Sequence, residues 1–318
     1  SMASTTQLLD VRTQTWDREL LSHLDLPQRI FLPIIRPGQL LGETTDAIQA
    51  ETGMKLPVAS VCGHDTGSAV LAIPMEKGER CAYISCGTWS LLGVENPRAI
   101  TDPESCAANF TNEGGYEYRY RYLKNIMGLW LIQECRRDWQ KAGMSLSWND
   151  IVEEAKKAEP FRSIIDPDYG EFFAGGRMVE KIQDFCRGTN QPVPETVGQI
   201  ARCIYESLAL KYRWALERLE EIKGQRIDTL NIVGGGCQNK LLDQFAADSI
   251  DRPVITGPVE GAAIGNLLAQ AMALGDIHDI NELRDVVRRS ADVKTYSPHH
   301  TTDWEHAYQR MHSYMERK

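Results

Sequence analysis

A histidine and an aspartate follow an apolar run in the stretch 61-VCGHDTGSAV-70, and side chains of these types can carry acid–base chemistry. A carboxylate can accept a proton from a substrate hydroxyl, and a positioned general base typically speeds a reaction by about 10²–10⁴-fold. Asp65 is therefore a candidate general base, with His64 and Thr66 placed to orient a substrate hydroxyl beside it. Burial of Asp65 would tune its basicity.

A predicted strand and a predicted helix position these residues. The apolar run 56–61 predicts a short buried strand, and residues 66–73 predict the first turns of a helix. Asp65 then lies at a strand-to-helix switch, where α/β enzymes place catalytic groups. An N-cap role in that helix explains Asp65 equally well. For His64 alone, a hydrogen-bonded structural role is commoner than a catalytic one.

Two glycine-containing turns are candidate phosphate-binding sites. Residues 81–95 predict a hairpin whose tight turn at Gly87-Thr88 offers backbone N–H groups and a hydroxyl to a phosphate. Gly234-Gly235-Gly236 lies between a predicted strand and a helix N-terminus, where bare backbone can approach a nucleotide. The triple glycine fits neither GxGxxG nor GxxxxGK[ST]. The first turn is equally explained by an ordinary hairpin, and the triple glycine by a simple chain reversal. A nucleotide clamped between the halves of an α/β domain would require two such turns.

The remaining pattern predicts the fold class. Strands are predicted over 116–122, 229–233 and 253–256, and helices over 126–142, 194–222, 240–249 and 260–274. Alternation of strands and helices after residue 229 indicates an α/β fold with parallel strand pairing. The strand over 116–122 alternates tyrosine and arginine, which favours a half-exposed strand. The long helix is expected to pack one face against the rest of the protein, to expose the other face to solvent and to end before Gly224.

Composition limits the function classes. The chain has 318 residues, 42% of them hydrophobic, which is enough for two domains. A net charge of −9 without a long basic run disfavours nucleic acid and anionic membranes and favours a small-molecule partner. Eight cysteines without a CxxC pair, no apolar stretch of about 20 residues and no signal-like start favour the cytoplasm. The histidines at 299, 300, 306 and 312 lack a compact set of further ligands, so no metal site is predicted.

Five stretches taken together resemble the FGGY family of carbohydrate kinases. They are GHDTGSAV, SCGTWSLLGVE, NEGG followed by YLKNIMGLWLIQE, NIVGGGCQNKLLDQFAAD and PVEGAAIGNLLAQAMALGD. They occur in the family's order and spacing, and the match runs from Ala3 to near the C-terminus. The resemblance implies the actin-like ATPase (ribonuclease H-like) fold and phosphoryl transfer from Mg²⁺-bound ATP to a sugar hydroxyl.

The resemblance also implies roles for single residues. Asp65 matches the family's catalytic base and a sugar contact. The other matching sugar contacts are His64, Thr66 and Asn125, and the matching nucleotide contacts are Gly87, Thr88, Gln133, Gly235 and Asn239. The implied acceptor is the 1-hydroxyl of L-rhamnulose, with L-fuculose, a xylulose or glycerol as alternatives within the family. A non-catalytic nucleotide-binding module is the alternative from another class.

One departure from the family pattern is large. Upstream of the stretch that ASTTQLLDVRTQTW matches, family members carry most of an N-terminal domain, with the first phosphate-binding hairpin and an acidic residue for the metal. We therefore interpret residues 1–78 as the remainder of the N-terminal sugar-binding domain and residues 79–318 as the complete C-terminal nucleotide-binding domain. Phosphoryl transfer needs a cleft that positions both substrates and excludes water. Residues 1–318 alone are expected to be a very poor kinase.

Overall fold

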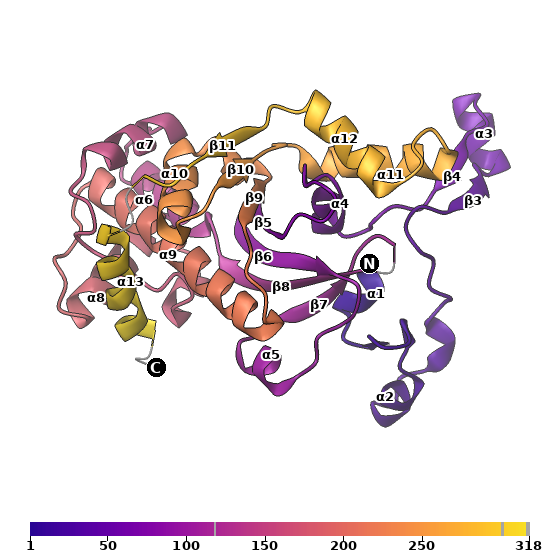
Figure 1. Ribbon diagram of the computed structural model, residues 1–318, viewed down its shortest axis with the longest axis horizontal. Helices are drawn as coiled ribbons and strands as arrows, with labels where there is room; N and C mark the ends of the chain where they lie inside the picture. Colours follow the sequence, from indigo (N-terminus) through magenta and orange to yellow (C-terminus); the bar gives the residue numbers. More distant parts are fainter. Residues whose placement is uncertain (118, 300–301, 316–318) are drawn as a thin grey trace. The chain divides into compact units, whose positions relative to one another are not determined.

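The main sheet contains strands from most of the chain's length (Figure 1). The computed structural model describes residues 1–117, 119–299 and 302–315. Within these residues the sheet has seven strands in the order β11-β10-β9-β5-β6-β8-β7. They are β5 (Cys81–Cys86), β6 (Trp89–Asn96), β7 (Thr111–Gly114), β8 (Tyr120–Met127), β9 (Thr229–Val233), β10 (Val254–Thr256) and β11 (Lys294–Tyr296). β9 pairs parallel with β5 and β10, which confirms the predicted α/β class and its parallel pairing, while β7–β8 and β10–β11 are antiparallel.

Packing divides the chain into two compact units. Unit 1 comprises Ser1–Glu79, Gly93–Leu123 and Glu260–Val293, and unit 2 comprises Arg80–Leu92, Lys124–Val259 and Lys294–Lys318. Each unit therefore uses three segments of the chain, and β6 and β8 contribute residues to both. The sequence boundary between residues 78 and 79 stays a prediction.

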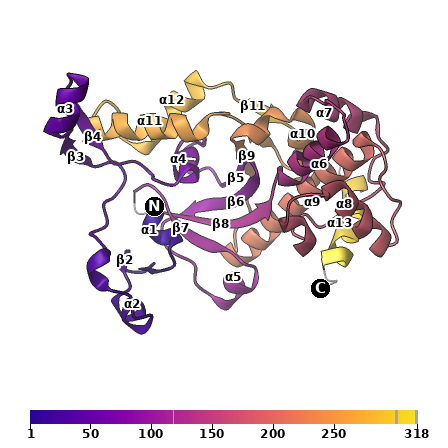
Figure 2. The ribbon, with the colours of Figure 1, turned by 180° about the vertical axis from the view of Figure 1, so that it is seen from behind.

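Unit 1 is organised around helices α4 and α11. Its helices are α1 (Met2–Thr5), α2 (Arg18–His23), η1 (Gln28–Ile30), α3 (Asp46–Thr52), α4 (Asp65–Leu71), α5 (Pro103–Ala107), α11 (Gly261–Leu274) and α12 (Ile280–Ser290). Its short strand pairs are β1 (Leu9–Asp10) with β2 (Thr15–Trp16) and β3 (Leu40–Glu43) with β4 (Pro57–Ala59). A Cβ on Gly265 of α11 would lie 1.8 Å from the carbonyl oxygen of Ser68 in α4. The two helices therefore meet at backbone contact (Figure 2).

The strand before the Asp65 segment differs from its prediction. Residues 56–61 were expected to form a buried strand, but β4 is limited to Pro57–Ala59, and Pro57 and Val58 are exposed. The reason is its partner: β4 pairs antiparallel with β3, whose four residues are themselves exposed. The predicted helix over 66–73 is confirmed as α4, although it begins at Asp65 and ends at Leu71.

The region around residue 120 also differs from its prediction. The predicted helix over 126–142 begins only at Trp130, because β8 continues to Met127. Side chains from Tyr120 to Lys124 are all buried, so the predicted half-exposed strand is wrong. Arg121, which the alternation placed on the exposed face, is instead paired with Glu113, and Lys124 beyond the predicted strand lies over the ring of Trp214. Tyr118, part of the predicted strand, lies outside the described residues.

Unit 2 is built around the longest helix, α9 (Val197–Lys223). Its other helices are α6 (Trp130–Lys141), α7 (Trp148–Lys157), η2 (Gly170–Phe173), α8 (Met178–Gly188), η3 (Gly235–Gln238), α10 (Lys240–Ile250) and α13 (Thr302–Met315). A capping box of Thr196 and Gln199 starts α9, and Gly224 at φ 61° ends it as predicted. The predicted solvent-exposed face is wrong for the middle of α9, where residues 203–212 are all buried. Helices α6, α7, α10 and α13 all contact α9.

Candidate active site

Three parallel strands of unit 2 end at one edge of the sheet, each followed by a glycine. The register pairs Ser85 of β5 with Val233 of β9, and Ile232 of β9 with Thr256 of β10. The glycines that follow are Gly87, Gly234 and Gly257. Because ligands of open α/β sheets bind outside the carboxyl ends of the strands, this edge is a candidate ligand site of the unit. The hairpin turn and the triple glycine, recognised separately in the sequence, therefore lie on neighbouring strands.

The three glycines after β9 are not equivalent. Gly234 has φ 87°, a conformation that favours glycine. A Cβ on Gly236 would lie 2.1 Å from the sulfur of Cys86, so packing excludes a side chain at that position. A Cβ on Gly235 would meet nothing within 4 Å. The middle glycine is thus the one whose backbone faces open space and can be approached by a ligand.

The hairpin turn is fixed against the start of α6. The amide of Gly87 donates to the carbonyl oxygen of Trp89 at 2.8 Å, and the carbonyl oxygen of Thr88 accepts from Gly128 at 3.2 Å and Trp130 at 3.1 Å. The Thr88 hydroxyl lies 3.4 Å from Oε1 of Gln133 on α6. Two predicted nucleotide contacts from different elements are therefore brought together.

Asn239 occupies the N-cap position of α10. Its side chain accepts from the amide of Leu242 at 3.2 Å and also hydrogen-bonds Tyr205, whose pKa burial raises. The cap explains Asn239 structurally, and its predicted adenosine contact stays a prediction. One turn further along α10, Asp243 is buried, and neither carboxylate oxygen has a hydrogen-bond partner among the described residues. Burial raises the pKa of Asp243 to about 8.

Asp65 begins α4 in unit 1 and differs from expectation in two respects. The N-cap position belongs to His64, so the N-cap explanation of Asp65 is wrong by one residue. The Asp65 side chain is 82% exposed, so the expected burial is also wrong. Its Oδ1 accepts from the Thr66 amide at 2.7 Å and lies 3.4 Å from the Thr66 hydroxyl. No described residue hydrogen-bonds Oδ2.

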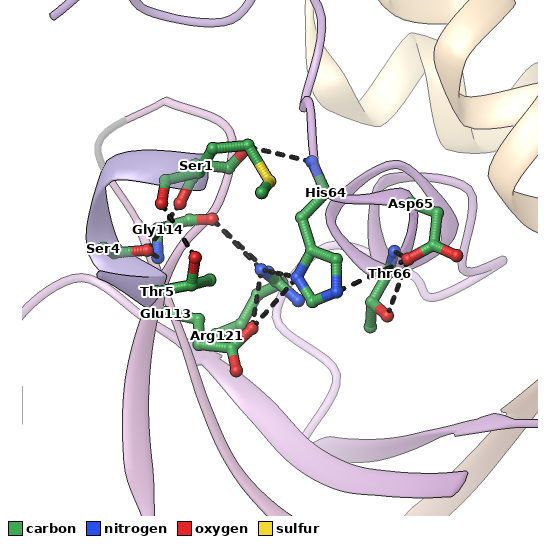
Figure 3. A network of polar contacts seen from close by, with 10 residues as sticks. Ser1, Ser4, Thr5, His64, Asp65, Thr66, Glu113, Gly114 and Arg121 are labelled. Carbon is green, nitrogen blue, oxygen red and sulfur yellow. Dashed lines mark hydrogen bonds and ion pairs between the residues drawn. The ribbon is translucent and has the colours of Figure 1, made fainter. Parts of the chain in front are cut away.

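His64 links Asp65 to a buried ion pair (Figure 3). The ring Nε2 lies 3.4 Å from Oδ1 of Asp65, and Nδ1 lies 3.1 Å from Nη2 of Arg121. Nη2 of Arg121 also lies 2.9 Å from Oε2 of Glu113, which is 3.2 Å from Nδ1 of His64. Sequence reasoning missed Glu113 and Arg121 as site residues. The signal for Glu113 was its place in the NEGG stretch, whereas the tyrosine–arginine alternation pointed Arg121 toward solvent.

The predicted sites fall into both units. His64, Asp65 and Thr66 belong to unit 1 and contact one another, while Asn125 on β8 and all the predicted nucleotide contacts belong to unit 2. The sugar contact at Asn125 therefore stays a prediction. Within residues 1–117, 119–299 and 302–315, no three histidine, cysteine, aspartate or glutamate side chains are grouped to hold a metal ion. His300 lies outside the described residues.

None of the helices in the described parts of the chain combines the length and the apolar character needed to cross a membrane.

Family comparisons decide what this arrangement belongs to. Residues 82–274 match the model of the FGGY family of carbohydrate kinases, C-terminal domain, and residues 1–72 match that of the N-terminal domain. The chain belongs to the FGGY family of carbohydrate kinases. Its relatives include rhamnulokinases from Bacteroides thetaiotaomicron, 45% identical over 97% of this chain, and Oceanobacillus iheyensis, 41% identical over 93% of it. The chain spans 63% and 62% of these two relatives' lengths, about three fifths.

Two solved kinase structures share the fold. Xylulose kinase from Rhodospirillum rubrum matches with a TM-score of 0.71 and 19% identity, covering 96% of this chain and 61% of that one. Plasmodium falciparum glycerol kinase with ADP matches with a TM-score of 0.74 and 14% identity, covering 98% and 61%. At these identities the likeness establishes the fold, which is the actin-like ATPase fold that the sequence resemblance implied.

Proposed function

We propose that the natural protein containing this chain transfers the γ-phosphoryl group of ATP to the 1-hydroxyl of L-rhamnulose, a step of rhamnose breakdown. The observation that carries this proposal is the 45% identity to a rhamnulokinase over 97% of the chain. The products are ADP and L-rhamnulose 1-phosphate, and one proton is released. The protein is proposed to act in the cytoplasm on small molecules, without nucleic acid or membrane partners, which suits its net charge of −9.

Asp65 is the proposed catalytic base. Its exposed Oδ2 accepts the proton of the 1-hydroxyl while the hydroxyl oxygen forms a bond to the γ-phosphorus. The bond between that phosphorus and the β,γ-bridging oxygen breaks, and ADP leaves with the electron pair. Phosphoryl transfer asks the protein mainly for positioning and charge stabilisation, so one carboxylate with oriented neighbours is sufficient chemistry. His64, Thr66 and Asn125 are the proposed sugar contacts.

The glycine-bordered edge of unit 2 is the proposed nucleotide site. The proposed contacts are Gly87, Thr88, Gln133, Gly235 and Asn239. The open backbone of Gly235 and the Thr88 hydroxyl suit a phosphate, because bare N–H groups and hydroxyls donate to phosphate oxygens. The donor is proposed to be Mg²⁺-bound ATP. The described residues offer no cluster of metal ligands, so no step is assigned to a protein-bound ion.

The test is the Asp65→Asn variant of the natural protein. Sugar-dependent release of ADP should fall at least 1,000-fold, because the base is lost, while the Kd for ATP stays within twofold. An Asp46→Asn variant on exposed helix α3 is the matched control and should keep full turnover. Unchanged turnover in Asp65→Asn would refute the assignment of the base. Nucleotide binding by the wild type without turnover on any sugar would favour the binding-module alternative.

The sugar is tested with a substrate panel on the wild-type natural protein. L-Rhamnulose is expected to give the highest kcat/KM, with L-fuculose, xylulose and glycerol at least tenfold lower. A higher value for one of the other three acceptors would reassign the substrate within the family.

A further inference from the structure

The protonation state of the His64 ring follows from its contact with Arg121. A guanidinium has only hydrogen-bond donors, so the 3.1 Å hydrogen bond from Nη2 of Arg121 requires a lone pair on Nδ1 of His64. A neutral imidazole with its lone pair on Nδ1 carries its proton on Nε2. Oε2 of Glu113 also lies 3.2 Å from Nδ1, but it forms no hydrogen bond with the ring, and its 2.9 Å contact with Nη2 of Arg121 is an ion pair.

In this tautomer the protonated ring nitrogen is the one next to the candidate base. Nε2 lies 3.4 Å from Oδ1 of Asp65, the oxygen that also receives the Thr66 amide at 2.7 Å. The Thr66 hydroxyl, at 3.4 Å, is a second donor to the same oxygen. The two oxygens of Asp65 therefore differ: Oδ1 accepts two hydrogen bonds from Thr66 and lies near Nε2 of His64, whereas no described residue hydrogen-bonds Oδ2.

The ion pair of Arg121 and Glu113 is buried and held by further hydrogen bonds. The Arg121 side chain is only 1% exposed and that of Glu113 only 12% exposed. Nε and Nη2 of Arg121 also donate to the carbonyl oxygen of Gly114, each at 3.4 Å. Removing one partner of a buried pair leaves the other charge uncompensated, which is strongly unfavourable. The guanidinium plane, and with it the donor aimed at His64, is thus held by β7 and β8 (Figure 3).

We propose that Arg121, held by Glu113, is a positioning residue for the catalytic base. It fixes His64 as the Nε2–H tautomer, whose N–H group lies next to Oδ1 of Asp65, attracts that oxygen electrostatically and leaves Oδ2 to take the substrate proton. The inference rests on the proposed kinase function only in its last step, because the tautomer follows from the contacts alone.

The kinetic test is a double-mutant cycle in the natural protein. Arg121→Lys keeps the charge but not the planar donor, so kcat should fall at least tenfold while KM for ATP changes less than twofold. In a His64→Ala background, the same Arg121→Lys change should lower kcat by less than twofold further, because its effect passes through His64. Equal losses in both backgrounds would overturn the proposal. Arg98→Lys, at an exposed arginine of the same unit, is the control and should leave kcat unchanged.

The direct test needs no turnover. Long-range ¹⁵N–¹H spectra of the histidine-labelled natural protein at pH 8 report the ring tautomer, and His64 signals are assigned by their loss in His64→Ala. We expect a protonated Nε2 and an acceptor Nδ1 in the wild type. A protonated Nδ1 would overturn the proposal even in an active kinase. The expected tautomer in a protein inactive on every sugar would refute the proposed function instead, and the wild-type spectrum remains decisive if a variant fails to fold.

Discussion

The sulfur of Cys86 occupies the space that a side chain on Gly236 would need. A Cβ built on Gly236 would lie 2.1 Å from Sγ and 2.5 Å from Cβ of Cys86, which ends strand β5. Gly235, one residue earlier, would place its Cβ more than 4 Å from any other group. Gly236 thus packs against the neighbouring strand, whereas the adjacent Gly235 is accessible to a ligand.

This contrast predicts different effects of the same substitution. Gly236→Ala should lower the free energy of unfolding by about 1–3 kcal/mol, because the β5–β9 edge must shift to admit a methyl group. Gly235→Ala should leave stability within about 0.5 kcal/mol but weaken ATP binding, because the methyl group fills the approach to the backbone. Urea unfolding and calorimetric titration with ATP measure the two effects. Equal stabilities would contradict the packing argument, and unchanged ATP affinity in Gly235→Ala would remove Gly235 from the nucleotide site.

Thr88→Val tests the hairpin turn as a phosphate contact. Valine has nearly the same shape but lacks the hydroxyl, and a hydrogen bond to a charged group contributes about 1.5–3 kcal/mol. The Kd for ATP should therefore rise roughly 10- to 100-fold, while the melting temperature changes little because Thr88 is exposed. Thr101→Val, at another exposed threonine, is the control. An unchanged Kd would mean that the turn serves only to support α6.

The contact between α4 and α11 should be sensitive to a single methyl group. Gly265→Ala would set a Cβ 1.8 Å from the carbonyl oxygen of Ser68, so the helices must separate. We expect a loss of about 1–3 kcal/mol in the free energy of unfolding. Leu267→Ala on the same helix, where the side chain is 64% exposed, should cost well under half of that. Similar losses for both variants would show that the helices have room to adjust.

Asp243 should make stability depend on pH. Its folded pKa, raised by burial to about 8, lies above the ordinary value of 3.8, so the folded state binds the proton more tightly. Its contribution to stability is fully present below about pH 4 and is lost as the pH rises towards 8. Asp243→Asn removes this dependence, so its stability relative to wild type should increase by about 1.4 kcal/mol per pH unit between pH 5 and 7.

Denaturant unfolding of both proteins at several pH values measures this difference. Asp251→Asn is the matched control, since Asp251 is exposed and asparagine tolerates its φ of 52°. Parallel pH curves for wild type and Asp243→Asn would show that the buried carboxyl finds a partner in solution.

Much of the glycine-bordered edge of unit 2 was predictable because local patterns determine it. The run 229–233 and the glycines after it predicted β9 and its turn, and the helix that follows was predicted to within one residue of its end. Parallel pairing was inferred for the strands after residue 229, whereas the pairing of β5 with β9, which brings the Gly87–Thr88 hairpin to this edge, is seen only in the structure. Glycine turns, caps and apolar runs act over a few residues, so one sequence reveals them.

The surroundings of Asp65 were less predictable because they depend on long-range partners. Arg121 alternates with tyrosines and suggested a solvent-facing position, yet an ion pair with Glu113 across two strands buries it. The exposure of β4 likewise depends on its partner β3 rather than on its own apolar residues. Pairing of this kind leaves no local pattern in the sequence, so the contacts of Arg121 and Glu113 with His64 became visible only in the structure.

The route of the chain through unit 1 also limits how related kinases can exchange parts. Helix α4 comes from residues 65–71 and its packing partner α11 from residues 261–274, with most of unit 2 between them. A hybrid gene joined once near residue 79 would combine an α4 from one parent with an α11 from the other. Because these helices touch at the backbone, their mismatch would not be absorbed by side-chain rearrangement. Functional hybrids are therefore expected chiefly when residues 1–79 and 260–293 are inherited from the same parent.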